Sequence, residues 1–443
     1  EIASCLVGSE MCIRDRNNIT YETLNNEIAI VDQDGTIHAN KMGTVEIIAT
    51  HTITHKSTTI FVQVVPVGKV TVPKLEIGAT HTAALKTDGT VWTWGSNSYG
   101  QLGTGDNINK AMPAKVMDIE NAIDISVGSY NTVVVKDDGT VWSFGYNGYG
   151  QLGDGTSSSR NTPVQVIKQN GKPLEKIVKI SAGTNKTIAL DENGNVWVWG
   201  NTYKSTATKL TTINNAIDIS PSYVVTQTGE VYTLEGEKLE IDNILRVSEG
   251  TNHALFLTKE GTGYSIGANS NGQLGDGTTV SKNSPTVIKT EKSNLTDIKE
   301  LKAGSGSSMA MMKNGDTYTW GSNNNNKLGT TATKNQIYPT KLENVNTSIS
   351  GDIGTDNGGI IDTQGFVYMW GLGTYGNLGN SLYNTSVEPV LVGAEEAGLD
   401  EYDIILHLGE THQITVTNKT FNVLKEIQET GTINYNIGNS NIA

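Results

Sequence analysis

The sequence predicts an all-β fold built from seven copies of one structural unit. In the cleanest copy, four glycines and a proline mark fixed places: Gly128, Gly139, Gly145, Gly153 and Pro163. They lie 0, 11, 17, 25 and 35 residues after the first glycine, and four other copies keep this spacing, beginning at Gly78, Gly250, Gly304 and Gly354. Two further copies, at Gly183 and around Gly229, are shortened. A period of about 50 residues is typical of solenoids, propellers and arrays.

Each copy has the pattern of a β-hairpin with one further strand on either side. Short apolar runs flank dipeptides such as Asp138-Gly139 and Asn193-Gly194, which tolerate positive φ and close tight hairpins. Other apolar runs precede the hairpin and follow the proline, so each copy predicts a four-stranded sheet. Large aromatics buried between such sheets would supply packing that one small sheet lacks. All seven tryptophans lie in the strand that ends at the third glycine; they are Trp92, Trp94, Trp142, Trp197, Trp199, Trp320 and Trp370.

These repeats resemble those of the regulator of chromosome condensation (RCC1) family. The resemblance rests on the patterns Gly-x-x-His-x-x-x-Leu, Asp-Gly-x-Val-Trp-x-Trp-Gly and Gly-Gln-Leu-Gly, and it covers residues 70–393. It implies a seven-bladed β-propeller, for which seven copies are the required number. The pattern weakens in copies three and four, where no Gly-Gln-Leu-Gly follows Gly200 and where Glu235 stands in place of a glycine. Blades three and four should therefore have short rims.

The segments on either side resemble parts of bacterial immunoglobulin-like group 2 (BIG2) domains. Residues 17–67 contain strand-like runs and a Val-Asp-x-x-Gly hairpin, as in the C-terminal half of such a β-sandwich. Residues 396–443 are similar to the opening strands of a second one, and the pattern Ile-x-Tyr-x-x-x-Asn-x-x-Ile-Ala occurs at both 19–29 and 433–443. We therefore expect a propeller at 68–395 within a longer tandem of propellers and immunoglobulin-like modules. An eighth repeat starting at Gly409 is the alternative, but no Trp-Gly strand follows it.

Composition excludes several classes of protein. Residues 1–16 hold both cysteines and resemble a run found in translated sequencing-adaptor chimeras, so we interpret them as a non-native or disordered leader. The net charge is −14 without a basic stripe, which argues against a nucleic-acid surface. No apolar run approaches the ~20 residues that span a bilayer.

No motif for catalysis stands out, so we expect a protein that is not an enzyme and uses no cofactor or metal. The chain lacks Gly-x-Ser-x-Gly, His-Glu-x-x-His, Gly-x-x-x-x-Gly-Lys and Cys-x-x-Cys patterns. His81 and His253 share one repeat position, where a polar side chain is expected to satisfy backbone groups of its own loop. Asp154 and Asp276 follow Gly-Gln-Leu-Gly, but one carboxylate per loop is far short of the six or more oxygens that Ca²⁺ takes, which favours turn chemistry.

One face of the predicted propeller carries the candidate binding residues. In an up-and-down blade, the connections between strands one and two and between strands three and four emerge on the same face. Tyrosine or asparagine recurs there four residues after the third glycine. Such side chains either brace their own loops or contact a protein or glycan partner. The candidate set is Tyr99, Tyr146, Tyr149, Asn271, Asn325 and Tyr375.

The fold class alone does not choose a function. The bacterial type of the flanking modules favours a non-enzymatic, secreted or cell-surface binding and adhesion module. The first alternative is a protein inhibitor of a secreted hydrolase such as a β-lactamase, with Tyr99, Tyr146 and Tyr149 as its exposed aromatics. The second, by family analogy, is a guanine-nucleotide-exchange regulator. A hydrolase or lyase is disfavoured because the sequence shows no arranged nucleophile or metal ligands.

Overall fold

The computed structural model describes residues 19–24, 26, 29–33, 37–39, 43–52, 57–64, 71–343, 345, 347–393, 398–399, 416–423 and 427–431. Nearly all of the ordered structure in these ranges is β-strand, with a single 3-10 turn, η3, at Asn324–Asn326. Among these residues, no helix is long and apolar enough to cross a membrane. The predicted all-β class is confirmed.

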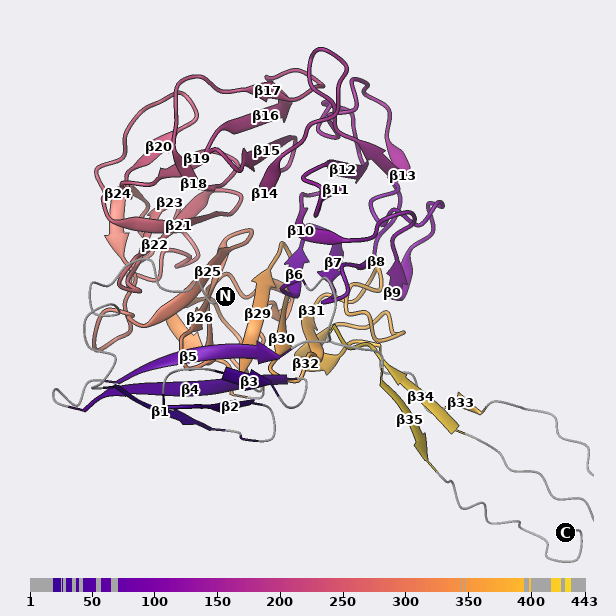
Figure 1. Cartoon of the computed structure of the whole chain (residues 1–443). Helices are drawn as coiled ribbons and strands as arrows, with labels where there is room; N and C mark the ends of the chain where they lie inside the picture. Colours follow the sequence, from indigo (N-terminus) through magenta and orange to yellow (C-terminus); the bar gives the residue numbers. More distant parts are fainter. Residues whose placement is uncertain are drawn as a thin grey trace, which may run out of the picture.

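Seven small antiparallel sheets stand around one axis as the blades of a propeller (Figure 1). Within each blade the strands are hydrogen-bonded in chain order, and the first strand lines the central cavity. The predicted seven-bladed β-propeller is therefore confirmed.

Blades 1 to 4 are made of the following strands. Blade 1 has β6 (Lys74–Ile77), β7 (His81–Leu85), β8 (Val91–Gly95) and β9 (Lys110–Lys115); blade 2 has β10 (Ala122–Val127), β11 (Asn131–Lys136), β12 (Val141–Gly145) and β13 (Arg160–Gln165); blade 3 has β14 (Ile177–Ala182), β15 (Lys186–Asp191), β16 (Val196–Gly200) and β17 (Thr208–Lys209); blade 4 has β18 (Ala216–Ile219), β19 (Tyr223–Thr226) and β20 (Val231–Thr233).

Blades 5 to 7 are four-stranded. Blade 5 has β21 (Ile244–Glu249), β22 (His253–Thr258), β23 (Gly263–Gly267) and β24 (Lys282–Val287); blade 6 has β25 (Ile298–Ala303), β26 (Ser307–Met312), β27 (Thr317–Gly321) and β28 (Gln336–Lys341); blade 7 has β29 (Ser348–Ile353), β30 (Asn357–Asp362), β31 (Val367–Gly371) and β32 (Ser386–Leu391).

The outer strands of blades 3 and 4 are short, as predicted, whereas the fourth strand of blade 2 begins earlier than predicted. Blade 3 ends in the two-residue β17, and the sheet of blade 4 has three strands, so their predicted short rims are confirmed. In blade 2 the fourth strand begins at Arg160, ahead of Pro163 instead of after it. A proline fits inside this strand because an outer edge strand has one side without a hydrogen-bonded neighbour.

The hydrophobic core is divided into seven clusters, each of which joins two adjacent blades. Four tryptophans, Trp94, Trp199, Trp320 and Trp370, are fully buried in these interfaces, and Phe144 takes the same place in blade 2. The indole nitrogen of Trp320 donates to the carbonyl of Gln273 in the preceding blade at 2.9 Å. The predicted role of aromatic residues between blades is therefore confirmed for the inner tryptophan of the strand.

The first glycine of the repeat allows neighbouring blades to approach at their backbones. A Cβ at Gly78 would collide with the carbonyl of Gly128, and a Cβ at Gly354 would collide with that of Gly78. Main-chain contacts continue this ring, for example from the Ser305 N–H to the Gly354 oxygen at 3.3 Å. In blade 4 Pro221 lies at this place, against Gly183.

Short sheets flank the propeller in sequence. On the N-terminal side, β1 (Ile19–Thr23), β4 (Gly43–His51) and β5 (Ser57–Val64) form one antiparallel sheet, and β2 (Ala29–Val31) pairs with β3 (Ile37–Ala39). On the C-terminal side, β33 (Gly398–Leu399), β34 (Val416–Thr420) and β35 (Ile427–Gly431) form a third sheet. In the part of residues 17–67 that the structure describes, the expected strand-like runs are present as β1 to β5.

Candidate functional site

The two kinds of loop that carry the candidate residues lie on one face, which we call the long-loop face. The loops between strands three and four hydrogen-bond to the loops between strands one and two at their bases. In blade 1 the Ser96 N–H donates to the Thr80 oxygen at 2.9 Å, and in blade 2 the Tyr146 N–H donates to the Tyr130 oxygen at 2.8 Å. The predicted placement of these loops is therefore confirmed.

In blades 1, 2, 5 and 6 an asparagine two residues after the third glycine holds the long loop together from inside. Asn147 is fully buried, its Oδ1 accepts from the Leu152 N–H at 3.0 Å, and its Nδ2 donates to the carbonyls of Thr156 and Ser158 at 3.1 Å. Asn269 makes the same pattern of contacts in blade 5. These asparagines therefore brace their own loops, which is the first of the two roles expected for such side chains.

Asp154 takes part in the same internal structure. Its Oδ1 accepts from the Thr156 N–H at 2.9 Å, and its Oδ2 pairs with the Arg160 guanidinium at 2.9 Å. Hydrogen bonds to Thr156 outweigh burial and lower the pKa of the Asp154 carboxyl. This carboxylate is therefore used in a turn, as the sequence predicted, and also in an ion pair that was not predicted.

The residue four positions after the third glycine has a fixed backbone and an outward side chain. The N–H groups of Tyr99 and Tyr149 donate to the side-chain oxygens of Gln101 and Gln151 at 2.9 and 3.0 Å. The side chains of Tyr99 and Tyr149 are 43% and 49% exposed. The glutamine of Gly-Gln-Leu-Gly thus orients the loop that presents each tyrosine.

Four tyrosines of blades 1 and 2 form one aromatic cluster on the long-loop face, which we call the tyrosine cluster. The ring of Tyr99 lies edge-on to Tyr146 at 5.0 Å between centroids and to Tyr130 at 5.5 Å, and Tyr146 lies edge-on to Tyr149 at 6.3 Å. Three of the six predicted residues are therefore brought together. Tyr130 was missed by the sequence analysis, although its place two residues after Gly128 put it on the same face.

The other three predicted residues lie apart from this cluster. The Oδ1 of Asn271 accepts from Nδ2 of Asn335 at 3.0 Å, which ties blade 5 to blade 6. Asn325 has a φ of 57° and donates to Asp356 at 2.9 Å, which ties blade 6 to blade 7. Tyr375 is 42% exposed on blade 7, and the described ring contacts do not join it to the tyrosine cluster. The two asparagines thus brace loops, and Tyr375 offers a separate exposed ring.

His81 and His253 are buried between blades. Nε2 of His81 lies 2.8 Å from the Thr132 hydroxyl, which donates in turn to the Gln101 carbonyl at 2.9 Å, so the ring nitrogen is the donor. Nε2 of His253 lies 2.8 Å from the Ser308 hydroxyl. Their partners are therefore side chains of the next blade, not backbone groups of their own loops as we expected. Burial lowers the pKa of both imidazoles from 6.5 to about 3, so they stay neutral at physiological pH.

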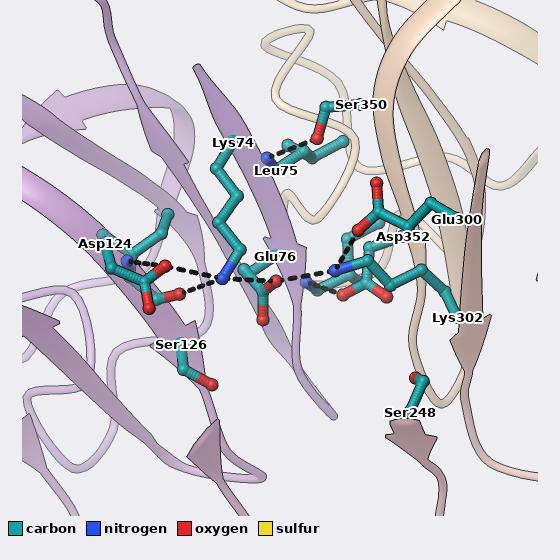
Figure 2. A network of polar contacts seen from close by, with 12 residues as sticks. Lys74, Leu75, Glu76, Asp124, Ser126, Ser248, Glu300, Lys302, Ser350 and Asp352 are labelled. Carbon is teal, nitrogen blue, oxygen red and sulfur yellow. Dashed lines mark hydrogen bonds and ion pairs between the residues drawn. The ribbon is translucent and has the colours of Figure 1, made fainter. Parts of the chain in front are cut away.

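A polar cavity of about 760 Å³ lies inside the ring, lined by the first strands of all seven blades. Figure 2 shows the charged residues that meet there: Lys74 pairs with Asp124 at 2.8 Å, and Lys302 pairs with Glu76 at 2.9 Å. Despite the opposing effect of burial, Lys302 and Lys74 lower the pKa of Glu76 to about 2. The pKa of Lys302 is raised well above its usual value by Glu76 and Glu300 against the effect of burial. We call this group of five residues the channel network.

The channel network was not among the predicted site residues, but the repeat carries a signal for it. Charged residues stand four places before the first glycine in five copies: Lys74, Asp124, Lys179, Arg246 and Glu300. On an inner strand that packs between two blades, this position must face a polar space or an ion partner. Asp124 shows how such a charge is held, because it also accepts from the Ile180 N–H of the next blade at 3.0 Å.

Models of known protein families match both the propeller and the N-terminal segment. The model of the RCC1-like domain matches residues 113–423, models of the RCC1 repeat match residues 88–135 and 74–101, and that of the bacterial Ig-like domain (group 2) matches residues 13–62. Among solved structures, yeast RCC1 (Prp20) in complex with Kap60 is similar, with a TM-score of 0.61, 21% identity, and coverage of 73% of this chain and 85% of that one. Prp20p of Saccharomyces cerevisiae, described for its binding to Gsp1p and histones, gives a TM-score of 0.59, 20% identity, and coverage of 73% and 87%.

Curated relatives are larger proteins of which the chain spans a part. Human E3 ubiquitin-protein ligase HERC2 is 32% identical over 216 residues, which are 48% of this chain and 4% of that protein. The probable E3 ubiquitin-protein ligase HERC4 of Rattus norvegicus is 32% identical over 71% of this chain and 28% of its own length. Protein pim1 of Schizosaccharomyces pombe is 24% identical over 68% of this chain and 59% of its own length. With a family model that matches most of its length, the chain belongs to the RCC1-like domain family.

Proposed function

We propose that this protein is a non-enzymatic recognition module that binds a protein partner through the tyrosine cluster of blades 1 and 2. The observation that carries the proposal is the edge-to-face chain Tyr130–Tyr99–Tyr146–Tyr149 on the long-loop face. Exposed tyrosines held in place by their neighbours offer large contact area at a small loss of side-chain entropy, and tyrosine is enriched at binding hot spots.

The surroundings of the cluster support binding of a broad protein surface. Ile108, at the tip of the blade 1 long loop, is 66% exposed. On blade 7, which adjoins blade 1, Leu382 and Tyr383 are 51% and 60% exposed, in addition to Tyr375. Exposed apolar and aromatic side chains on three successive blades mark an interaction surface rather than a small-molecule pocket. The similar Prp20 structures are of a protein that binds other proteins, which supports the same class of function.

The disposition of reactive groups supports a role other than catalysis. His81 and His253 are 1% and 4% exposed and donate to hydroxyls inside blade interfaces, where a substrate does not reach them. The ligase names of the HERC relatives belong to proteins of which this chain spans 4% and 28%. We therefore assign the propeller itself to binding.

We further propose that the protein works outside the cell or on the surface of a bacterial cell. The observation behind this proposal is the match of residues 13–62 to a bacterial Ig-like domain (group 2). Labelling of intact cells with an antibody to the propeller tests it. Signal that appears only after permeabilisation would contradict a surface location.

The test of partner binding uses the full chain immobilised on a sensor. Analytes are bacterial surface proteins, secreted hydrolases including β-lactamases, GDP-loaded small GTPases and a glycan panel. The variant Tyr99→Ala/Tyr149→Ala should weaken a protein partner at least about tenfold, because hot-spot tyrosines contribute on the order of 1–2 kcal/mol each. The control Val280→Ala removes an exposed side chain (62%) from a long loop of blade 5 and should leave Kd unchanged.

The identity of the analyte then separates the candidate functions. A hydrolase that is bound and inhibited indicates the inhibitor role, and a GTPase that releases its nucleotide indicates exchange activity. A surface protein bound without inhibition indicates adhesion. Protein binding that survives the double tyrosine variant, or binding of glycans alone, would overturn the proposal.

A further inference from the structure

Three residues that follow β34 are packed between blades 7 and 1 of the propeller, although they belong to neither blade. β34 and β35 form an antiparallel hairpin with Thr420 opposite Ile427, and Figure 1 shows this hairpin running away from the ring. The residues directly after β34, Phe421, Asn422 and Val423, are only 8%, 1% and 0% exposed. We call Phe421–Val423 the hairpin tip.

The hairpin tip is held by the main chains of two blades. The Val423 N–H donates to the Gly365 oxygen of blade 7 at 2.9 Å, and the Val423 oxygen accepts from the Thr87 N–H of blade 1 at 3.0 Å. The side-chain amide of Asn422 donates to the Gln364 oxygen at 3.0 Å. The tip therefore connects blade 7 with blade 1.

The other six blade interfaces show what position the tip fills. In each of them, the residue at the start of the next blade's first strand donates its N–H to the hairpin glycine of the preceding blade, as Ala122 does to Gly89 at 2.9 Å and Ile298 to Gly261 at 3.0 Å. In the seventh interface Val423 makes this bond to Gly365. In blade 1 the residue that corresponds to Ala122 is Val72, because each lies six residues before the first glycine of its repeat. Val72 is 76% exposed instead of bonded to blade 7. The tip thus replaces a residue that blade 1 does not supply.

Side-chain packing at this interface is specific for the tip sequence. The ring of Phe421 lies edge-on to Trp92 at 5.6 Å and to Trp94 at 5.9 Å, and the Lys86 ammonium lies 5.6 Å from its centroid. Val423 and Phe421 belong to the core cluster of blades 7 and 1, together with Leu75, Ile361 and Val367. An aromatic residue followed two places later by an aliphatic one matches this slot.

We propose that the slot between blades 7 and 1 is a peptide-binding site for an aromatic-x-aliphatic segment, and that the hairpin tip occupies it in cis to close the ring. The inner part of the seventh interface has its own direct bonds, such as Ile77 N–H to Asp352 at 2.7 Å and the Trp94 indole to the Asn377 oxygen at 2.9 Å. Release of the tip therefore opens the side of the interface that carries the hairpin turns and leaves the rest of the ring assembled.

Hydrogen exchange on the full chain tests the closure. The variant Phe421→Ala/Val423→Pro removes the aromatic ring and the N–H that binds Gly365. Amides around Thr87 and Gly365 should then exchange at least about tenfold faster, while blades 3 to 5 keep their protection. The matched control Val72→Ala changes the exposed residue of blade 1 and should alter neither. The milder Phe421→Leu keeps the experiment interpretable if the double variant does not fold.

Binding in trans tests the slot itself. A fluorescein-labelled peptide with the sequence of residues 417–423, Thr-Asn-Lys-Thr-Phe-Asn-Val, should bind the tip variant saturably and restore slow exchange at Thr87. It should bind the wild-type chain far more weakly, because the slot is already filled, and the same peptide with alanine for phenylalanine should not bind. Unchanged exchange in both tip variants would overturn the closure, and failure of the peptide to bind a tip variant with fast exchange would overturn the peptide site.

Discussion

His81 and His253 illustrate how one repeat position can serve the contact between blades. Each imidazole donates to a hydroxyl on the second strand of the next blade, and Thr132 and Ser308 pass the hydrogen bond on to a glutamine carbonyl. The structural role of these histidines was predictable from the repeat. Their partners were not, because the repeat pattern does not say which side chain of the neighbouring blade faces a given position.

Their burial predicts a pH dependence of stability. With a folded pKa of about 3 and an ordinary value of 6.5, the unfolded chain binds more protons between these limits. The contribution of His81 is fully present above pH 6.5 and is lost as the pH falls toward 3, by about 2 kcal/mol between pH 7 and pH 5. The variant His81→Asn, which places the residue of blade 2 at this position, should lose correspondingly less stability over that interval in urea unfolding.

Comparison of His81→Asn with the wild type separates the pH dependence of stability due to His81 from that due to the buried carboxylates. Asp352, whose pKa burial raises to about 6, has the opposite effect on stability in this range, but it is common to both proteins. Thr132→Val removes the partner without removing the titrating group, and it should lower stability at both pH values. Equal pH slopes for His81→Asn and the wild type would contradict the assignment.

The third strand of the blade has two aromatic positions that differ in burial and in their contacts. The inner one, as in Trp320, is fully buried between blades, whereas the outer one, as in Trp142, is half-buried and donates to the Thr140 hydroxyl at 3.2 Å. The sequence predicted both aromatic positions from one Trp-x-Trp pattern. It could not distinguish them, because alternation along a strand gives the two faces but not which neighbour covers each.

Substitutions at the inner position should follow its packing. Trp320→Ala should lower the free energy of unfolding by about 3–5 kcal/mol, because it leaves a large cavity between blades 5 and 6. Trp320→Phe should cost about 1 kcal/mol, since the Gln273 carbonyl that loses the indole still accepts from Ser308 at 2.8 Å and blade 2 already carries Phe144 here.

Urea unfolding of the full chain measures both substitutions. Trp142→Ala, at the half-buried outer position, is the matched control and should cost clearly less than Trp320→Ala. Similar losses for the two alanine variants would mean that the blade interface is not the main source of stability in this strand.

On the scale of the whole molecule, the ring is held by contacts that no repeat contains. Lys302 of blade 6 reaches Glu76 of blade 1, although blade 7 stands between them in the ring. The number of blades followed from counting repeats, and the hairpins followed from their turn sequences. The repeat signals the charged positions of the channel network but not their partners, and it does not signal the hairpin tip, because the contacts Lys302–Glu76 and Thr87–Val423 join residues more than 200 positions apart.

Removal of one charge from the channel network should lower the stability of the folded protein. Glu76→Gln should destabilise the protein by about 3 kcal/mol, because it leaves the largely buried ammonium groups of Lys302 and Lys74 short of a partner. With a folded pKa of about 2, the contribution of Glu76 is present above pH 4.5 and is lost as the pH falls from there toward 2.

A double-mutant cycle separates this ion pair from its surroundings. Glu76→Gln, Lys302→Gln and the double variant, unfolded in urea at pH 7, should show a coupling energy of about 1–3 kcal/mol. Additive effects would show that the two side chains stabilise the ring independently, in spite of the 2.9 Å between them.

The position of the hairpin tip also determines when the ring can close during synthesis. The last described residue of blade 7 is Gly393, whereas the ring gains its final contact only when Val423 is available. At ~5–20 residues per second, translation of the intervening stretch of about 30 residues takes ~2–6 s. For that interval a nascent chain with seven complete blades leaves the slot beside Trp92 open, so chaperones and neighbouring nascent chains can reach a surface that the finished protein conceals.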